Sequence, residues 1–211
     1  KPKKKARIVI LDTGVDAGHE DLQGNYRSLN KKYDRDLRQH GTHCAGIAAG
    51  VTNNGKGIAS LSPGNDFVEV SSVTVLNGPG GSGSQKTILQ GILTAADAGA
   101  DVLSLSLGGP SSRSRQRAYA QAVSYANRKG AIVVCAAGNN GGDARQIAPA
   151  NAPGVITVSA LDEQLQRAVF SNSVAELKMG IAAPGVNIYS TVPGSTYKTM
   201  SGTSMATPQV A

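Results

Sequence analysis

Short apolar runs alternate with longer amphipathic stretches along most of this chain. Five runs rich in β-branched residues and leucine, with Gly, Pro or Asn close behind, predict buried strands at residues 7–11, 68–76, 101–107, 131–136 and 155–159. The expected helices are at residues 41–50, 85–98 and 113–129, with a last one beginning near Ser204. Strands that alternate with helices indicate βαβ units. We therefore expect an α/β fold with a mostly parallel central sheet buried on both faces.

The length and composition of the chain fit one globular domain. Its 211 residues are 40% hydrophobic and 17% charged, which is neither the profile of a disordered segment nor that of a coiled coil. We expect a single domain over residues 1–211, with a basic tail at residues 1–6. No apolar run approaches the roughly 20 residues of a membrane-spanning helix, so the sequence predicts a soluble protein without a membrane partner.

The net charge of +7 does not by itself indicate a nucleic-acid-binding protein. Aromatic residues, which stack on bases, make up only 4% of the chain, and Arg113, Arg115 and Arg117 lie among Ser and Gln. We therefore expect no nucleic acid partner. The two cysteines, Cys44 and Cys135, are too few for a disulfide scaffold and lie in apolar or small-residue stretches, which predicts two buried free thiols.

Three polar residues stand where an α/β fold places its chemistry, at the carboxyl ends of strands and the starts of helices. Asp12 follows the first predicted strand, and His40 opens the first predicted helix. Ser204 precedes Pro208, which has no N–H group and is therefore expected within the first four positions of a helix. Together a carboxylate, a histidine and a serine supply an orienting group, a general base and a nucleophile.

Four motifs carry a resemblance to a known family: Asp-Thr-Gly at 12–14, His-Gly-Thr-His at 40–43, Ala-Ala-Gly-Asn at 136–139 and Gly-Thr-Ser-Met-Ala at 202–206. The order Asp, His, Ser is that of the subtilisin class. From about residue 7 to residue 211 the sequence resembles the subtilisin-like serine proteases, or subtilases, including the proteinase K group. The resemblance implies a three-layer subtilisin-like fold whose C-terminal part, beyond the serine motif, is missing from this chain.

The resemblance also implies a role for each site residue. His40 would accept the proton of Ser204 as the serine attacks a peptide carbonyl, and Asp12 would hold His40 in position. The side-chain amide of Asn139 and the backbone N–H of Ser204 would donate to the oxyanion of the intermediate. The second histidine of the motif, His43, would be structural. These roles describe a serine endopeptidase that forms an acyl-enzyme.

Substrate binding in this family resembles the addition of a strand between two edge segments. Glycine-rich stretches at 81–83 and 106–109 match these segments. No charge faces the matching specificity pocket, so we expect broad specificity with apolar side chains at P1, the residue on the acyl side of the cleaved bond, and with Ile147 limiting their size. The predicted substrate-binding residues are Gly81, Ser82, Gly83, Ser106, Leu107, Gly108, Gly109, Ala136 and Gly138.

Two kinds of metal site can be weighed. His40, His43 and Cys44 are zinc-ligand types, but their spacing does not match a histidine pair four residues apart with a helical glutamate, so zinc is not expected. The resemblance implies a structural calcium ion instead. The matching oxygen ligands are Asp21, Asn53 and Asn54. A solvated turn explains the same residues, because Lys56 lies in their loop.

Two functions stay open from the sequence. The first is a secreted endopeptidase that acts on polypeptides and is inhibited by its own pro-segment before maturation, as the resemblance implies. The second is a catalytically silent subtilisin-like module that binds peptides through the same groove, which the end of the chain soon after Ser204 favours. We prefer the first, because all four catalytic positions are filled and function follows from the site rather than from the fold.

Overall fold

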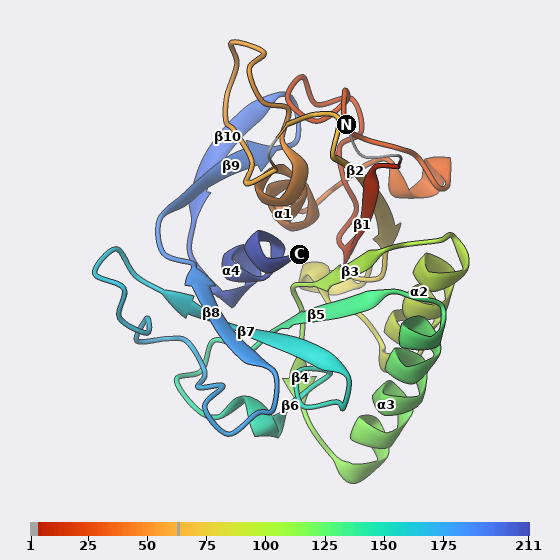
Figure 1. The fold of residues 1–211 in the computed structure, drawn as a ribbon, viewed down its shortest axis with the longest axis vertical. Helices are drawn as coiled ribbons and strands as arrows, with labels where there is room; N and C mark the ends of the chain where they lie inside the picture. Colours follow the sequence, from red (N-terminus) through yellow and green to blue (C-terminus); the bar gives the residue numbers. More distant parts are fainter. Residues whose placement is uncertain (1–3, 63) are drawn as a thin grey trace.

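A six-stranded parallel sheet forms the centre of the computed structural model, which describes residues 4–62 and 64–211 (Figure 1). Each neighbouring pair of strands is parallel. Across the sheet the strands are β2 (Val68–Thr74), β1 (Ala6–Asp12), β3 (Val102–Leu105), β5 (Ile132–Ala136), β7 (Val155–Leu161) and β8 (Gly180–Pro184). Because the strands are parallel, their carboxyl ends meet at one edge of the sheet, and Asp12 is the last residue of β1.

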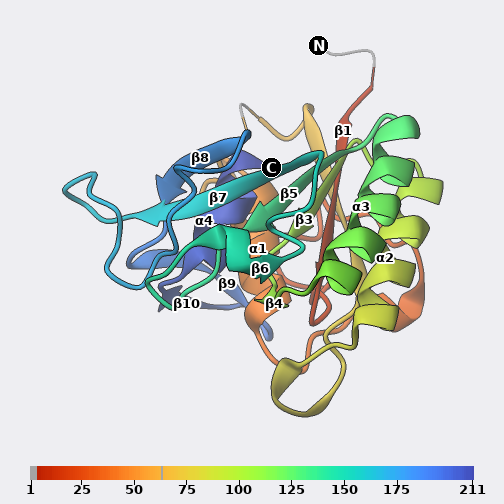
Figure 2. The ribbon, with the colours of Figure 1, turned by 90° about the horizontal axis from the view of Figure 1, so that it is seen from below.

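Helices cover both faces of the sheet (Figure 2). They are α1 (His40–Ala49), α2 (Gln85–Asp97), α3 (Arg113–Arg128) and α4 (Thr203–Val210). α2 and α3 lie side by side on one face, and α1 and α4 lie on the other. Neighbouring residues of β1 point to opposite faces, so Val9 and Leu11 pack beneath α2 and α3, whereas Ile8 and Ile10 pack beneath α1. The predicted three-layer α/β fold is confirmed.

Short elements complete the described part of the chain. They are the antiparallel pairs β4 (Gly109–Pro110) with β6 (Ile147–Ala148) and β9 (Ile188–Val192) with β10 (Thr196–Met200), and the 3-10 turns Lys31–Tyr33, Pro79–Gly81 and Ala144–Gln146. β9 packs directly on α1, where Ser190 and Thr191 each donate a hydroxyl hydrogen bond of 2.8 Å to a backbone carbonyl of the helix. A side chain at Gly46 would collide with these hydroxyls, which explains the small residues of α1.

The predicted strands and helices are present, with small shifts at their ends. The sequence does not predict β8, which reads Gly-Ile-Ala-Ala-Pro and is a mostly exposed strand at the sheet edge. The expected basic tail is only partly seen, since residues 1–3 lie outside the described part. Lys4 forms an ion pair of 3.2 Å with Asp101, and β1 already begins at Ala6. Among the described residues, no helix is long and apolar enough to cross a membrane.

Candidate active site

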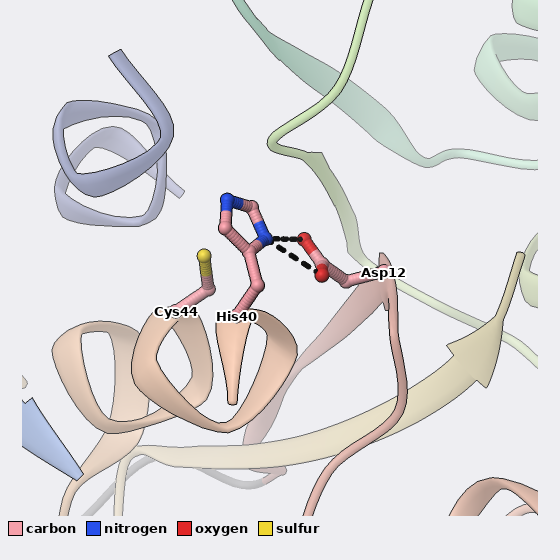
Figure 3. Close-up of side chains that lie close together, drawn as sticks. All are labelled: Asp12, His40 and Cys44. Atoms are coloured by element: carbon pink, nitrogen blue, oxygen red, sulfur yellow. Dashed lines mark hydrogen bonds and ion pairs between the residues drawn. The ribbon is translucent and has the colours of Figure 1, made fainter. Parts of the chain in front are cut away.

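Asp12 and His40 face each other across the first βα connection (Figure 3). The Nδ1 atom of His40 lies 2.7 and 2.8 Å from the two carboxylate oxygens of Asp12. An ionised carboxylate only accepts hydrogen bonds, so Nδ1 carries the proton and the opposite nitrogen, Nε2, is left as the basic atom. Asp12 is fully buried, and one of its oxygens also accepts a bond of 2.7 Å from the backbone N–H of Thr13. The carboxylate therefore fixes both the tautomer and the orientation of the imidazole.

The protonation of His40 is set by two opposing effects. Burial of the ring lowers the pKa of His40, while the charge of Asp12, its hydrogen bond and the charge of Asp36 raise it. The charges outweigh the burial, so the pKa of His40 stands above its ordinary value of 6.5. His40 is therefore suited to act as a base, because the nearby carboxylates stabilise its protonated form.

Asp36 holds the start of α1 in place. Its buried carboxylate accepts bonds of 2.9 and 2.7 Å from the backbone N–H and the hydroxyl of Thr42, and a bond of 2.8 Å from the hydroxyl of Thr13. The N–H groups of residues 38 and 39 donate to it at 2.8 and 3.0 Å. These bonds satisfy free donors of the helix N-terminus and tie the strand end that carries Asp12 to the helix that carries His40.

Ser204 stands in the first turn of α4, but the position of Pro208 differs from the expectation. Pro208 is the sixth residue of α4 rather than one of its first four, so that expectation is wrong. A proline there cannot donate to the carbonyl four residues earlier, which belongs to Ser204. That carbonyl accepts instead from Ser106 Oγ at 2.8 Å and from Cys44 Sγ at 3.4 Å. These side-chain donors replace the missing helix bond.

The hydroxyl of Ser204 donates to the backbone carbonyl of Ser106 at 3.3 Å. No hydrogen bond joins Ser204 to His40 in the described part of the chain. Hydrogen bonds between a nucleophile and its base are often long or poorly aligned before substrate binds, so this arrangement is compatible with a nucleophile that rotates about its Cα–Cβ bond. The structure thus joins two of the three predicted catalytic residues directly, and the hydroxyl of the third is hydrogen-bonded to the carbonyl of Ser106.

Asn139 presents its amide nitrogen to the same end of α4. Its carbonyl oxygen accepts two bonds from Thr203, at 2.8 Å from the backbone N–H and at 2.9 Å from the hydroxyl. The Nδ2 group is therefore the part of the exposed side chain left to donate elsewhere. Gly138 precedes it with φ +100°, and a Cβ there would lie 2.6 Å from Nδ2 of the buried Asn172. Asn172 Nδ2 donates a hydrogen bond of 2.9 Å to the carbonyl of Ala137, which holds this loop in place.

A cleft of about 490 Å³ runs beside His40. The predicted substrate-binding residues that line it are Gly81, Ser82, Gly83, Ser106, Leu107, Gly108 and Gly109. Gly81 ends a 3-10 turn, and Ser82 and Ser84, which follow it before α2, are extended. The two predicted edge segments therefore do face one hollow that also contains His40.

The other predicted substrate residues lie beside this cleft rather than in its wall. Ala136 is the buried last residue of β5, and Gly138 lies in the loop that follows it. Ile147 joins the two regions: a Cβ on Gly108 would lie 2.8 Å from Ile147 Cγ2, and a Cβ on Gly138 would lie 3.2 Å from Ile147 Cγ1. The pairing of Gly109 with Ala148 holds the segment of Ile147 against the cleft.

Comparisons with known proteins agree with this geometry. The family model described as "Subtilase family" matches residues 3–211. The chain belongs to the subtilase family. It is 46% identical to thermitase of Thermoactinomyces vulgaris over 98% of this chain and 72% of that protein. It is 44% identical to the thermophilic serine proteinase of Bacillus sp. (strain AK1), over 97% of this chain and half of the relative.

A solved structure supports the same assignment. The crystal structure of a cold adapted subtilisin-like serine proteinase matches with a TM-score of 0.81 and 33% identity, over 97% of this chain and 72% of that one. This subtilase is thus a serine-type endopeptidase, and polypeptides are its substrates.

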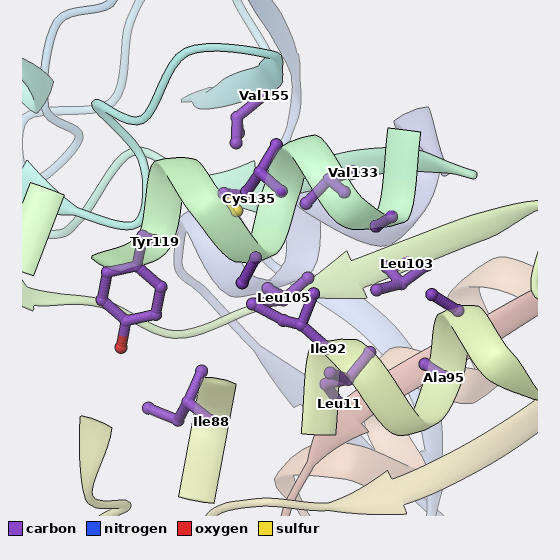
Figure 4. Close-up of a cluster of buried hydrophobic side chains, with 14 of the residues drawn as sticks. Leu11, Ile88, Ile92, Ala95, Leu103, Leu105, Tyr119, Val133, Cys135 and Val155 are labelled. Atoms are coloured by element: carbon purple, nitrogen blue, oxygen red, sulfur yellow. The ribbon is translucent and has the colours of Figure 1, made fainter. Parts of the chain in front are cut away.

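Cys44 lies one turn after His40 in α1 of this subtilase, on the same side of the helix (Figure 3). Asp12, His40 and Cys44 each have one potential metal-ligand atom, and these three atoms lie within 4.8 Å of one another. Burial raises the pKa of the Cys44 thiol well above its ordinary value, so it is a neutral thiol and a poor metal ligand. Cys135 is buried among apolar side chains beneath α3 (Figure 4). Both are free thiols.

The expected calcium ligands do not form an oxygen cage in this structure, although subtilases generally bind calcium. Both oxygens of the buried Asp21 accept hydrogen bonds from nitrogen, at 2.6 Å from Asn54 Nδ2 and at 2.8 Å from the backbone N–H of Ile58. The side-chain oxygen of Asn54 accepts from the backbone of Lys56, and Asn53 has φ +58° in a loop turn. These donors fit a hydrogen-bonded loop, so the calcium ligand set stays a prediction.

Two residues of the site are missed by sequence reasoning. Asp36 precedes His40 by four residues, in the polar stretch before α1, and its only sequence signal is an acidic residue ahead of a helix start. Asn172 lies far along the chain in a loop of ordinary polar composition. His43, by contrast, is placed as the family motif implies, because its Nε2 bonds to the backbone carbonyl of Lys198 at 2.8 Å, and Asp12 bonds His40 instead.

Proposed function

We propose that this subtilase cleaves peptide bonds with Asp12, His40 and Ser204 acting as a triad. His40 Nε2 accepts the hydroxyl proton as Ser204 Oγ attacks the carbonyl carbon, and the imidazolium that forms is stabilised by Asp12. The same proton then passes to the leaving amine, which gives an acyl-enzyme, and water repeats the sequence to release the acid. The observation that carries the proposal is the paired bond between Asp12 and His40 Nδ1, which leaves Nε2 basic.

The oxyanion of each tetrahedral intermediate would receive two hydrogen bonds. One comes from Asn139 Nδ2, whose partner oxygen is held by Thr203. The other comes from the backbone N–H of Ser204, which lies in the first helical turn, where such groups have no partner within the helix. Both donors are fixed before the reaction, so they stabilise the developing charge without reorganisation.

The triad is tested by labelling with a sulfonyl fluoride, followed by intact-mass measurement and peptide mapping. We expect one adduct on Ser204, because only a hydroxyl with an assembled base reacts quickly. The variant His40→Ala is expected to show no adduct while keeping the far-UV circular dichroism of the parent. A folded parent protein without any adduct would instead indicate a silent peptide-binding module.

We also propose broad specificity with an apolar P1 side chain. The P1 side chain would enter between Gly108 and Gly138, with Ile147 between them as the base of the pocket. Ile147 is buried and apolar, and a γ-branched or aromatic side chain at P1 would meet its methyl groups. A profile of cleavage sites on a peptide library should therefore favour small and medium apolar residues at P1. The variant Ile147→Ala should admit larger ones, and a profile led by Lys or Arg would refute this pocket.

Processing and location remain part of the proposal. A protease that could degrade the polypeptides of the cell that makes it needs to be inactive until it is released. The cleft beside His40 offers the place for an inhibitory pro-segment to bind as a strand. We accordingly propose that this subtilase acts outside the cell after loss of a pro-segment.

A further inference from the structure

Basic side chains gather on one side of the cleft. A second hollow, of about 980 Å³, lies between the loop at residues 32–38, the end of β2 and the start of α2. Four cations line it: Lys32, Arg35, Arg38 and Lys86. Of the described residues that line either hollow, none is acidic. The field of such a hollow attracts negatively charged groups and repels positive ones.

No carboxylate in the described part of the chain forms an ion pair with any of the four cations. Some basic residues elsewhere pair with a carboxylate, as Arg7 does with Glu69 at 2.9 Å and Arg145 with Asp143. Among the four, Lys32 Nζ lies 4.9 Å from the ring centroid of Tyr33.

Two acidic residues, Asp34 and Asp36, flank Arg35 in the sequence. The carboxylate of Asp34 accepts hydrogen bonds from the hydroxyls of Tyr26 at 2.8 Å and Ser28 at 2.6 Å. Asp36 is buried. Both of its oxygens point inward and accept hydrogen bonds from Thr13, Thr42 and two backbone N–H groups. The guanidinium of Arg38 is exposed, so it stays available to a ligand.

Arg38 brings this charge into the cleft itself. Together with Thr13 and Leu76, it lines both the second hollow and the cleft that holds His40. Side chains of an extended peptide alternate between two sides. In the strand-like binding mode, a P1 side chain directed toward Ile147 would leave the preceding side chain, P2, on the side of the cleft that His40 and Arg38 line.

We propose that this subtilase prefers substrates with a carboxylate side chain at P2, which Arg38 binds with support from the field of Lys32, Arg35 and Lys86. The proposal rests on the strand-like binding mode proposed above. An exposed ion pair of this kind corresponds to about a threefold to fivefold preference for Glu over the isosteric Gln at low salt. The preference should shrink toward one at high salt, since exposed charges are screened.

The experiment separates recognition from cleavage. Two peptides that differ only by Glu or Gln at P2 are bound to the Ser204→Ala protein, and the ratio of their Kd values is measured at ionic strengths of about 0.01 M and about 1 M. The same ratio is measured after adding Arg38→Gln. A matched control is Arg117→Gln, because Arg117 is also an exposed arginine but lines neither hollow.

We expect the Glu peptide to bind more tightly at low salt, with the ratio falling toward one in Arg38→Gln but not in Arg117→Gln. Equal Kd values for both peptides would overturn the proposal. A preference that survives Arg38→Gln but is lost in Arg115→Gln would also overturn it, since Arg115 lines the far end of the cleft. Cleavage of the two peptides by the parent protein tests the proposed triad separately, so the two failures are distinguishable.

Discussion

Asp12→Asn is expected to lower kcat by about 10⁴-fold, the scale seen when the triad aspartate of a serine protease is replaced by asparagine. The Asp12 carboxylate accepts both from His40 Nδ1 and from the backbone N–H of Thr13. An asparagine in the same place offers one accepting oxygen. The Thr13 N–H competes for that oxygen, and the new NH₂ group favours the imidazole tautomer with its proton on Nε2. That tautomer cannot accept the proton of Ser204.

The pH profile of kcat/KM provides a second readout that a purely structural defect would not move. In the parent, activity requires neutral His40, so it is lost as the pH falls through the pKa of His40, which stands above 6.5. Removing the charge of Asp12 removes a cause of that raised pKa, so the acid limb of the residual activity should shift to lower pH.

Asp97→Asn is the matched control, since Asp97 pairs on the surface with Lys129, away from the cleft. Parent-like kcat in Asp12→Asn, or an unmoved acid limb, would contradict the role proposed for Asp12.

The sequence predicts the layers of this fold because its strongest signals are local. The runs that become β1, β3 and β5 are continuous, apolar and β-branched or leucine-rich, since these strands are buried on both faces. β8 has no such run because it lies at the sheet edge and is mostly exposed. The sequence does not predict the hairpin of β9 and β10 either, because two of its three buried residues, Ser190 and Thr191, carry hydroxyls that bond to α1, and only Val192 is apolar.

The residues of the candidate site also fall into two groups, those that the sequence predicts and those that only the structure shows. Motifs predict Asp12, His40, Ser204 and Asn139 as site residues, because the proposed chemistry requires particular residue types at particular element ends. The groups that hold them are found only in three dimensions. Nothing near Pro208 in the sequence shows that Ser106 and Cys44 satisfy the carbonyl that the proline leaves free. A motif likewise does not show that the Ser204 hydroxyl donates to the Ser106 carbonyl.

Asn139→Ala is expected to lower kcat by about 10²–10³-fold, the scale established for the corresponding asparagine of subtilisin, a member of this family. KM should change little, because Asn139 Nδ2 acts on a charge that develops only after attack begins. The orientation of the amide is fixed, because Thr203 holds its oxygen at 2.8 and 2.9 Å. The amide therefore cannot turn its oxygen toward the oxyanion, and Nδ2 remains the donor.

That restraint yields a graded test of the oxyanion donor. Thr203→Val removes the hydroxyl bond to Asn139 but keeps the backbone bond, so its kcat should fall by less than in Asn139→Ala. Combining the two variants should add little to the loss from Asn139→Ala alone, because Thr203 acts through the amide. Asn127→Ala on α3, remote from the cleft, controls for loss of an amide. Fully additive effects of the two variants would show that Thr203 supports catalysis by another route, and an unchanged kcat in Asn139→Ala would remove the amide from the mechanism.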